Sequence, residues 1–405
     1  MIFYLFQFLT VQLGWKIPSV FTYSSTRMIL AALTTLLFTI FLGPRFIKKL
    51  YEMKIGQSIR VEDCPLLGQL HEKKKDTPTM GGILLLSSMV LSLFLWMNWK
   101  SSFTLVLLVT TVWLGFIGGY DDYLKLKRKS PKGMSAKTKF LLQNTLSILL
   151  ALYFLCPSLT AKVQVGDYFA PPSAKELNVG KDDKPATIQT LSTQAYMTRY
   201  YVPFWKDPVV IFSGFLLFIP FLFSIFIITG SSNAVNLTDG LDGLASGCLL
   251  FVAVVLSIVA FLSNNIEISR YLHILYIEDS GEIAVYLCAL FGACLGFLWY
   301  NGYPAQVFMG DTGSLALGGI IGVCALLLRR EALLGIVGGI FVAEAASVIL
   351  QVGSYKLRNK KRIFLCSPLH HHFEYKGWPE TKVVLRFWIV GLILAIIGLA
   401  SLKFQ

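Results

Sequence analysis

Long hydrophobic runs alternate with short polar segments along almost the whole chain. Ten of these runs are long enough to cross a membrane, because an α-helix rises about 1.5 Å per residue and the hydrocarbon core is roughly 30 Å thick. The predicted spans are residues 26–43, 80–97, 103–120, 139–156, 208–229, 241–262, 283–300, 313–328, 332–352 and 384–402. The runs are long and do not alternate between polar and apolar residues, which argues against a β-barrel. The pattern therefore predicts an all-α polytopic membrane protein with about ten transmembrane helices.

Composition supports this class. Of the 405 residues, 55% are hydrophobic and 15% are charged, whereas a soluble domain carries about 25% charged residues. The net charge of +13 could suit a nucleic-acid partner. However, the basic residues follow the loops between the spans and form no basic domain, so we expect no nucleic-acid binding.

The basic residues also predict the orientation. Loop 44–79 carries eight Lys and Arg residues, and loops 121–139 and 353–383 carry seven each. These loops alternate with poorer ones, and Lys and Arg near spans stay in the cytoplasm. Both termini are then extracytoplasmic. We expect one integral-membrane domain over residues 1–405, with residues 157–207 as an extracytoplasmic insert within it.

Acidic residues stand at the predicted cytoplasmic ends of three spans. They are Asp121, Asp122, Asp239, Asp242 and Asp311. A charge at a membrane boundary is costly and usually marks an ion or substrate site. Asp121 and Asp122 can share a helix face with Lys125. A solvated helix end with ion pairs explains that pair equally well, but adjacent carboxylates can also bind Mg²⁺ or position a phosphate group.

A second motif carries polar residues at every third position. Asn233, Asn236, Asp239 and Asp242 follow this spacing into the predicted span 241–262. A helix cap would explain one Asp but not four polar groups. Gly240 and Gly243 would let the backbone approach a ligand closely. The motif therefore favours a functional site.

Three further motifs suit phosphate groups. Asp311 is expected at the N-terminus of span 313–328, a position that favours anions and that could hold Mg²⁺ between carboxylate and phosphate oxygens. The run Lys73–Lys75 precedes Thr77-Pro-Thr79 and could hold an anionic substrate or serve only as a positive anchor. His370–His372 suit phosphate contacts better than zinc, because sequential His residues cannot easily reach one metal ion. Glu344, within span 332–352, could be functional or a structural partner.

Taken together, these motifs resemble the polyprenyl-phosphate N-acetylhexosamine-1-phosphate transferases. The resemblance covers nearly the whole chain and rests on Asp121-Asp122, on residues 236–243 and on residues 308–314. The stretch from His370 to Trp378, with Arg386-Phe-Trp388, resembles the branch that acts on muramoyl-pentapeptide and not the GlcNAc-1-phosphate branches.

The resemblance implies a reaction. Undecaprenyl phosphate and UDP-N-acetylmuramoyl-pentapeptide would give lipid I and UMP, the first membrane step of peptidoglycan synthesis. It implies Mg²⁺ as cofactor, a bacterial cytoplasmic (inner) membrane with the active site facing the cytoplasm, and a homodimer. We favour direct attack by the lipid phosphate, because no residue is clearly placed as a covalent nucleophile.

The resemblance also implies roles for residues. Asp121, Asp122, Asp311 and His370 match catalytic positions, and Asp311 matches the metal ligand. Nucleoside-pocket positions fall on Lys74, Gly240, Leu241, Asp242, Asn301 and Phe308, with Phe308 expected to stack on uracil. Other substrate-binding positions fall on Thr79, Lys125, Lys137, Asn233, Asn236, Asp239 and His371.

Three other classes of protein remain open from the residues alone. An ion-coupled transporter would also use intramembrane carboxylates, although it would place them at mid-bilayer and not at one face. A membrane phosphatase acting on polyprenyl pyrophosphate would need no uridine pocket. A lipid-binding scaffold would show no turnover that depends on Mg²⁺.

Overall fold

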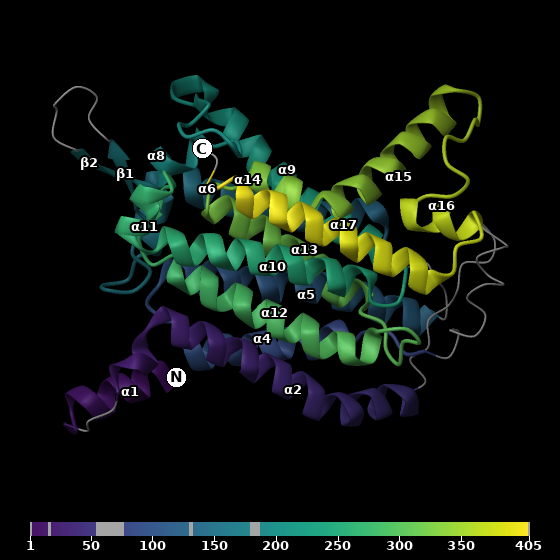
Figure 1. Cartoon of the computed structure of the whole chain (residues 1–405), viewed down its shortest axis with the longest axis horizontal. Helices are drawn as coiled ribbons and strands as arrows, with labels where there is room; N and C mark the ends of the chain where they lie inside the picture. Colours follow the sequence, from purple (N-terminus) through teal and green to yellow (C-terminus); the bar gives the residue numbers. More distant parts are fainter. Residues whose placement is uncertain (1, 15–17, 54–76, 129–132, 179–186, 404–405) are drawn as a thin grey trace.

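Figure 1 shows the computed structural model, which describes residues 2–14, 18–53, 77–128, 133–178 and 187–403. Long apolar helices lie side by side and form a bundle. These helices are α2 (Ser24–Glu52), α4 (Gly82–Trp96), α5 (Ser102–Arg128), α6 (Ala136–Leu155), α9 (Phe218–Thr238), α10 (Leu244–Ser263), α12 (Gly281–Asn301), α13 (Gly310–Leu327), α15 (Gly339–Leu357) and α17 (Glu380–Ala400). Within the described residues, nine helices are long and apolar enough to cross a membrane, and α4 is a shorter apolar helix. The prediction of a mainly helical, multi-pass membrane protein is confirmed.

Two predicted spans differ from the structure. The span expected at 208–229 begins only at Gly214, with the 3₁₀ turn η3 (Gly214–Leu217) leading into α9. The residues before it include the short strand β4 (Val210–Ile211). The predicted span began too early because a short apolar run does not by itself distinguish a strand from a helix. The span expected at 332–352 is broken at Gly338 into α14 (Glu331–Val337) and α15, where two successive glycines disfavour a continuous helix.

Short elements complete the fold. The helical ones are α1 (Ile2–Val11), which was not predicted, η1 (Ser19–Thr22), α7 (Pro157–Val163), α8 (Thr193–Met197), α11 (Ile266–Tyr271) and α16 (Leu369–Tyr375). The strands β1 (Ala174–Asn178), β2 (Thr187–Leu191) and β5 (Tyr276–Ile277) form an antiparallel sheet in the order β2-β1-β5, and β3 (Arg199–Tyr200) pairs with β4. The all-α prediction is wrong for these strands. Because β1 pairs with β5, the insert 157–207 is tied to the segment between α11 and α12.

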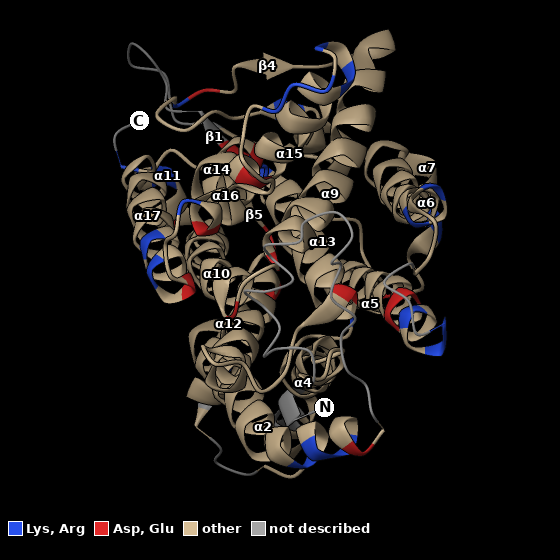
Figure 2. Ribbon diagram, turned by 90° about the vertical axis from the view of Figure 1, so that its right-hand side faces the viewer, with Lys and Arg blue, Asp and Glu red and all other residues tan. Residues whose placement is uncertain are grey.

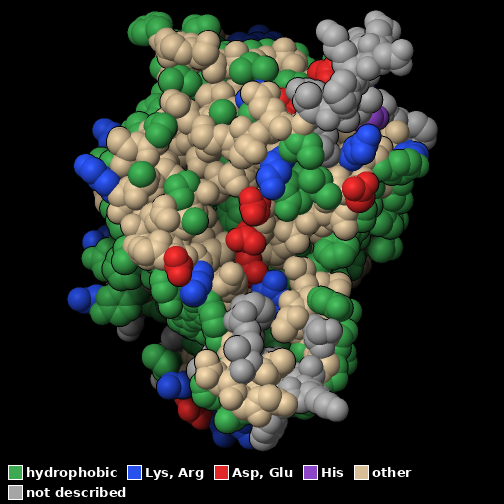
Figure 3. Space-filling model, turned by 90° about the vertical axis from the view of Figure 1, so that its left-hand side faces the viewer, with side chains coloured by type: hydrophobic (Ala, Val, Ile, Leu, Met, Phe, Trp, Pro, Cys, Tyr) green, Lys and Arg blue, Asp and Glu red, His purple; other side chains and the backbone are tan. Residues whose placement is uncertain are grey.

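The bundle has two distinct ends. We call them the aspartate end, where α5 finishes and α13 begins, and the hairpin end, where β1 and β2 lie (Figure 1). The aspartate end faces the viewer in Figure 2. Figure 3 shows the hairpin end, with acidic side chains near its centre and hydrophobic ones around its edges. The two described ends of the chain both lie towards the hairpin end (Figure 1).

The most buried of the candidate spans is α13, which packs against α5 and α9. Its contact with α5 is so close that a Cβ added at Gly118 would lie 2.1 Å from the carbonyl oxygen of Asp311. Only a glycine allows the two backbones to meet in this way. This contact brings the end of α5, with Asp121 and Asp122, against the first turn of α13.

A buried ion pair joins helices near the hairpin end. Arg27 of α2 and Glu282 of α12 lie 2.7 Å apart, nitrogen to oxygen, and both side chains are buried. Arg27 also donates to the carbonyl oxygen of Trp96, and Glu282 accepts from the backbone N–H of Asn98. The pair therefore holds α2, α12 and the end of α4 together.

Removal of one partner of this pair should destabilise the protein strongly. Glu282→Ala leaves the guanidinium of Arg27 buried with its main counter-charge gone, which costs about 3–5 kcal/mol. We expect a clear fall in the apparent melting temperature in detergent. The double variant Arg27→Met/Glu282→Leu should regain part of the loss, and a double variant at least as unstable as Glu282→Ala would contradict this account.

Candidate functional site

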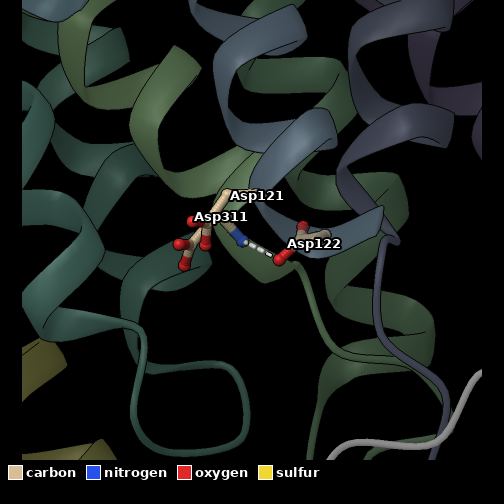
Figure 4. A group of neighbouring side chains, drawn as sticks. All are labelled: Asp121, Asp122 and Asp311. Atoms are coloured by element: carbon tan, nitrogen blue, oxygen red, sulfur yellow. Dashed lines mark hydrogen bonds between the residues drawn. The ribbon is translucent and has the colours of Figure 1, made fainter. Parts of the chain in front are cut away.

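Three aspartates from two helices meet at the aspartate end. Asp121 and Asp122 lie in the last turns of α5, and Asp311 lies in the first turn of α13 (Figure 4). Each offers one carboxylate oxygen, and these oxygens lie within 4.8 Å of one another. Asp121 and Asp122 are buried, while Asp311 is partly exposed. The three carboxylates can together hold a metal ion.

Asp122 differs from the other two because its oxygens bond the start of α13. They accept from the backbone N–H groups of Asp311 (3.2 Å) and Thr312 (2.9 Å), and from the Thr312 hydroxyl (2.7 Å). Figure 4 shows the first of these bonds. Free N–H groups at a helix start need such acceptors, and the helix dipole favours a negative charge there. Asp122 thus acts as the cap of α13.

Gly310 makes room for this arrangement. Its φ of 74° favours glycine. A Cβ there would lie 2.6 Å from a carboxylate oxygen of Asp122 and 2.8 Å from the Thr79 hydroxyl oxygen. Both the backbone conformation and the close approach therefore require glycine directly before Asp311.

Two lysines lie between Asp121 and Asp311. The ammonium nitrogen of Lys125 is 2.8 Å from Asp121 and 2.9 Å from Asp311, and that of Lys139 is 3.1 Å and 2.6 Å from the same residues. These positive charges compensate carboxylates that would otherwise repel each other. A site that holds two ammonium groups between carboxylates can also hold a metal cation.

Lys139 was not among the candidate residues. The family motif falls on Lys137, but Lys137 is exposed near the start of α6, whereas Lys139 reaches Asp121 and Asp311. The start of α6 decides between them: Ser135 caps the helix by accepting from the N–H of Thr138. The two lysines are separated by two positions, so they point to different faces. If the first residue of α6 had been known, the positions of the two lysines relative to it would have shown which one faces the cluster.

The second motif is divided between a helix and a loop. Asn233 and Asn236 lie in the last turns of α9, and α10 begins only at Leu244, so the expectation that the motif starts the next span is wrong. Asn236 donates to Asp311 (2.8 Å) and to Ser314 (2.8 Å). Asn233 donates to Gln143 of α6. The motif thus borders the aspartate cluster from the side of α9.

Asp239 stands directly after α9. Burial, and then the nearby carboxylates of Asp311 and Asp122, raise the pKa of Asp239 to about 7. Its carboxyl group is therefore partly protonated at neutral pH and adds less negative charge to the cluster than its residue type suggests.

Asp242 and Asn301 fix the loops around the site. Asp242 is buried and accepts from the backbone N–H of Ala305, while its own N–H donates to Glu380. The Asn301 amide oxygen accepts from Gly243 and Ser246, and its nitrogen donates to Val307. The side chains of these two candidate nucleoside-binding residues therefore form hydrogen bonds with other groups of the same chain. The candidate Leu241, directly before Asp242 in the loop, is buried.

The segment with Thr79 lies along the segment with Phe308. The N–H of Phe308 donates to the carbonyl of Pro78, and the N–H of Gly81 donates to the carbonyl of Phe308, both at 2.8 Å. Thr79 is buried and Phe308 is partly exposed. The candidate Lys74 lies outside the described residues.

His370 is a buried link between three elements. Its Nδ1 is 3.1 Å from a carboxylate oxygen of Glu344 in α15, and its backbone N–H donates to the same side chain. The opposite ring nitrogen would lie 2.3 Å from a Cβ at Gly240. His370 and Glu344 are fully buried. His371, by contrast, is partly exposed and pairs with Glu374 at 2.7 Å. Glu344, which the sequence left open, thus supports His370.

The chain is similar to known proteins over most of its length. The family model described as Glycosyl transferase family 4 matches residues 104–329, and that described as Phospho-N-acetylmuramoyl-pentapeptide-transferase signature 1 matches residues 74–86. A phospho-N-acetylmuramoyl-pentapeptide-transferase of Protochlamydia amoebophila is 67% identical over 395 residues, which is 96% of each chain. Proteins of the same name are 45% identical in Francisella philomiragia, over the whole of both chains, and 43% identical in Desulfotalea psychrophila, over 96% of each.

The contact of His370 with the loop after α9 can be tested by adding one methyl group. Gly240→Ala forces the loop or the buried ring to move, which should destabilise the protein by about 1–3 kcal/mol. Gly230→Ala is the matched control, because a Cβ there has open space within α9 and should stabilise by roughly 0.5–1 kcal/mol. Apparent melting temperatures in detergent give both values. Equal melting temperatures for the two variants would disprove the contact.

Proposed function

The chain belongs to the family of phospho-N-acetylmuramoyl-pentapeptide-transferases, and from this premise we propose that it transfers phospho-MurNAc-pentapeptide from UDP-MurNAc-pentapeptide to undecaprenyl phosphate. The products are lipid I and UMP, in the first membrane step of peptidoglycan synthesis. The observation that carries the proposal is the cluster of Asp121, Asp122 and Asp311 with two lysines at one end of a membrane-spanning bundle.

The donor atoms of this cluster fit Mg²⁺, which prefers oxygen ligands and is usually held by one or two carboxylates together with substrate phosphates. Asp311 would hold the ion, with Asp121 beside it. When bound, Mg²⁺ lowers the repulsion between the two phosphate groups and stabilises the departing UMP.

Two lysines of the chain would also reduce the repulsion between the two phosphate groups. Lys125 and Lys139 lie between the carboxylates and can turn to phosphate oxygens when a substrate enters. Fixed positive charge at the position of developing negative charge lowers the barrier of phosphoryl transfer.

The transfer proceeds by direct attack. An oxygen of the lipid phosphate forms a bond to the sugar-linked phosphorus, the bond from that phosphorus to the bridging oxygen breaks, and UMP leaves with the electron pair. The second pKa of a phosphate is near ~6, so the nucleophile needs little help from a base. Asp122 is engaged with the start of α13, which supports a positioning role for it and leaves Asp121 to orient the reacting groups.

The nucleoside pocket is assigned to the loops beside the cluster. Lys74, Gly240, Leu241, Asp242, Asn301 and Phe308 would form it. Phe308 is partly exposed and would stack on uracil. Asp242 and Asn301 would act mainly through the loops that they hold. His371 and Thr79 would line the path of the substrate, and His370 would support Gly240 from beneath.

The same proposal fixes the orientation in the membrane. The three loops rich in Lys and Arg join helices at the aspartate end, which supports a cytoplasmic position for this end. The nucleotide then arrives from the cytoplasm and the lipid carrier from the bilayer of the bacterial inner membrane. Both termini and the insert 157–207 are extracytoplasmic. A homodimer is proposed from the family resemblance alone.

The activity has a direct assay. Purified protein in detergent should release UMP from UDP-MurNAc-pentapeptide only with undecaprenyl phosphate and Mg²⁺, and EDTA should abolish the release. Asp311→Asn should lower the rate at least about 100-fold. Release with UDP-GlcNAc in place of the muramoyl nucleotide would overturn the branch of the family, and absence of release with either nucleotide would overturn the transferase.

The two lysines of α6 form a matched pair for the same assay. Lys139→Met removes a charge from the cluster and should lower kcat about 100-fold or more. Lys137→Met removes the same charge from an exposed position and should change kcat less than about threefold, since a solvated charge is strongly screened. The reverse order would show that the family position at Lys137 holds the role.

A further inference from the structure

The segment directly before α9 presents an apolar surface. Half of residues 202–217, which we call the apolar loop, are large apolar residues with exposed side chains. Phe215 is 89% exposed, and Trp205, Val209, Ile211 and Leu216 are each about half exposed or more. Exposed apolar surface of this extent marks a contact with a membrane or another protein.

The chain before this loop is fixed to the bundle. The guanidinium of Arg329 lies 4.5 Å above the ring of Tyr200, and that of Arg330 lies 5.5 Å from the ring of Tyr201. Arg329 also donates twice to the carbonyl oxygen of Arg199. The aromatic rings before residue 202 therefore face the protein, and the orientation of the apolar loop beyond them is set by these contacts.

The apolar loop continues the outer surface of a membrane span. Leu222 and Phe226, in the first turns of α9, are exposed in the same way, and the span Gly214–Thr238 is the least buried of the nine candidates. In Figure 1 the start of α9 projects from the bundle, level with the neighbouring helix ends, whereas β1 and β2 lie beyond those ends. The surface that contacts lipid on α9 therefore runs on into the loop.

We propose that the apolar loop lies in the bilayer leaflet at the hairpin end, which is the outer leaflet in the orientation proposed above, and anchors the insert there. Its partner is lipid: acyl chains around Ile211 and Phe215, and the headgroup region around Trp205. Tryptophan prefers this boundary. Lys206 and Asp207 are the charged residues of the loop, and both are exposed beside the polar pocket formed with Arg270 and His273. They can remain in the headgroup region while the apolar side chains enter the membrane.

The hairpin of the same insert has the opposite character. Lys175 and Glu176 of β1 are partly exposed, and Gln189 and Thr190 of β2 are exposed, so polar side chains occupy much of the described surface of this hairpin. A second copy of this chain or another protein could also cover an apolar loop. Continuity with the lipid-facing side of α9 favours lipid, because a bilayer that surrounds α9 reaches the loop without any additional partner.

The test compares two exposed isoleucines of the insert. Ile211 in β4 is 53% exposed and Ile188 in β2 is 57% exposed, so Ile211→Trp and Ile188→Trp add a similar reporter at sites with similar space. Each full-length variant is placed in vesicles of phosphatidylethanolamine and phosphatidylglycerol, with or without bromine atoms near the top of the acyl chains. The fluorescence of the added tryptophan is obtained by subtracting the spectrum of the unsubstituted protein.

The two positions should respond differently. Bromine should quench the tryptophan at 211 by about half or more and that at 188 by less than about a tenth, as expected for a side chain within the bilayer and one outside it. Trp205→Phe should remove a quenchable part of the native signal, which tests the loop with no new side chain. An unquenched tryptophan at 211, or equal quenching at 188 and 211, overturns the proposal.

Discussion

Three carboxylates packed at the end of an apolar bundle repel one another, and the rest of the site depends on how that repulsion is balanced. Asp122 bonds the free N–H groups at the start of α13. Asp121 and Asp311 share the ammonium groups of Lys125 and Lys139. Each negative charge therefore has a partner within the protein. The same carboxylates, held in place by these partners, could hold a metal ion.

The loops around the cluster show how a membrane enzyme keeps a polar site rigid. Asp242 and Asn301 accept hydrogen bonds from backbone N–H groups, and Glu344 accepts one from the backbone N–H of His370. Buried polar groups with satisfied hydrogen bonds specify one arrangement, whereas unsatisfied ones are costly. Much of the polar sequence near the aspartate cluster thus holds the surrounding loops in one shape.

The helices could be predicted because a bilayer requires long apolar segments, and that requirement is visible in the sequence alone. Prediction failed where a tertiary contact decides. Strand β4 pairs with β3, and a short apolar run does not reveal this. The choice between Lys137 and Lys139 depends on where α6 begins. Asp121 and Asp122 are adjacent and of one residue type, so only the position of α13 assigns them different partners.

The side chain of Asp122 has two functions, because it caps α13 and also belongs to the aspartate cluster. The helix it caps is the most buried of the candidate spans, so its start must be fixed for the bundle to pack. The same carboxylate belongs to the group of three aspartates that could hold a metal ion. Loss of activity on substitution of Asp122 would therefore not identify a chemical role, since folding and turnover would fail together. During evolution, a substitution of Asp122 would likewise affect helix capping and the aspartate cluster at the same time, whichever residue stands at position 121.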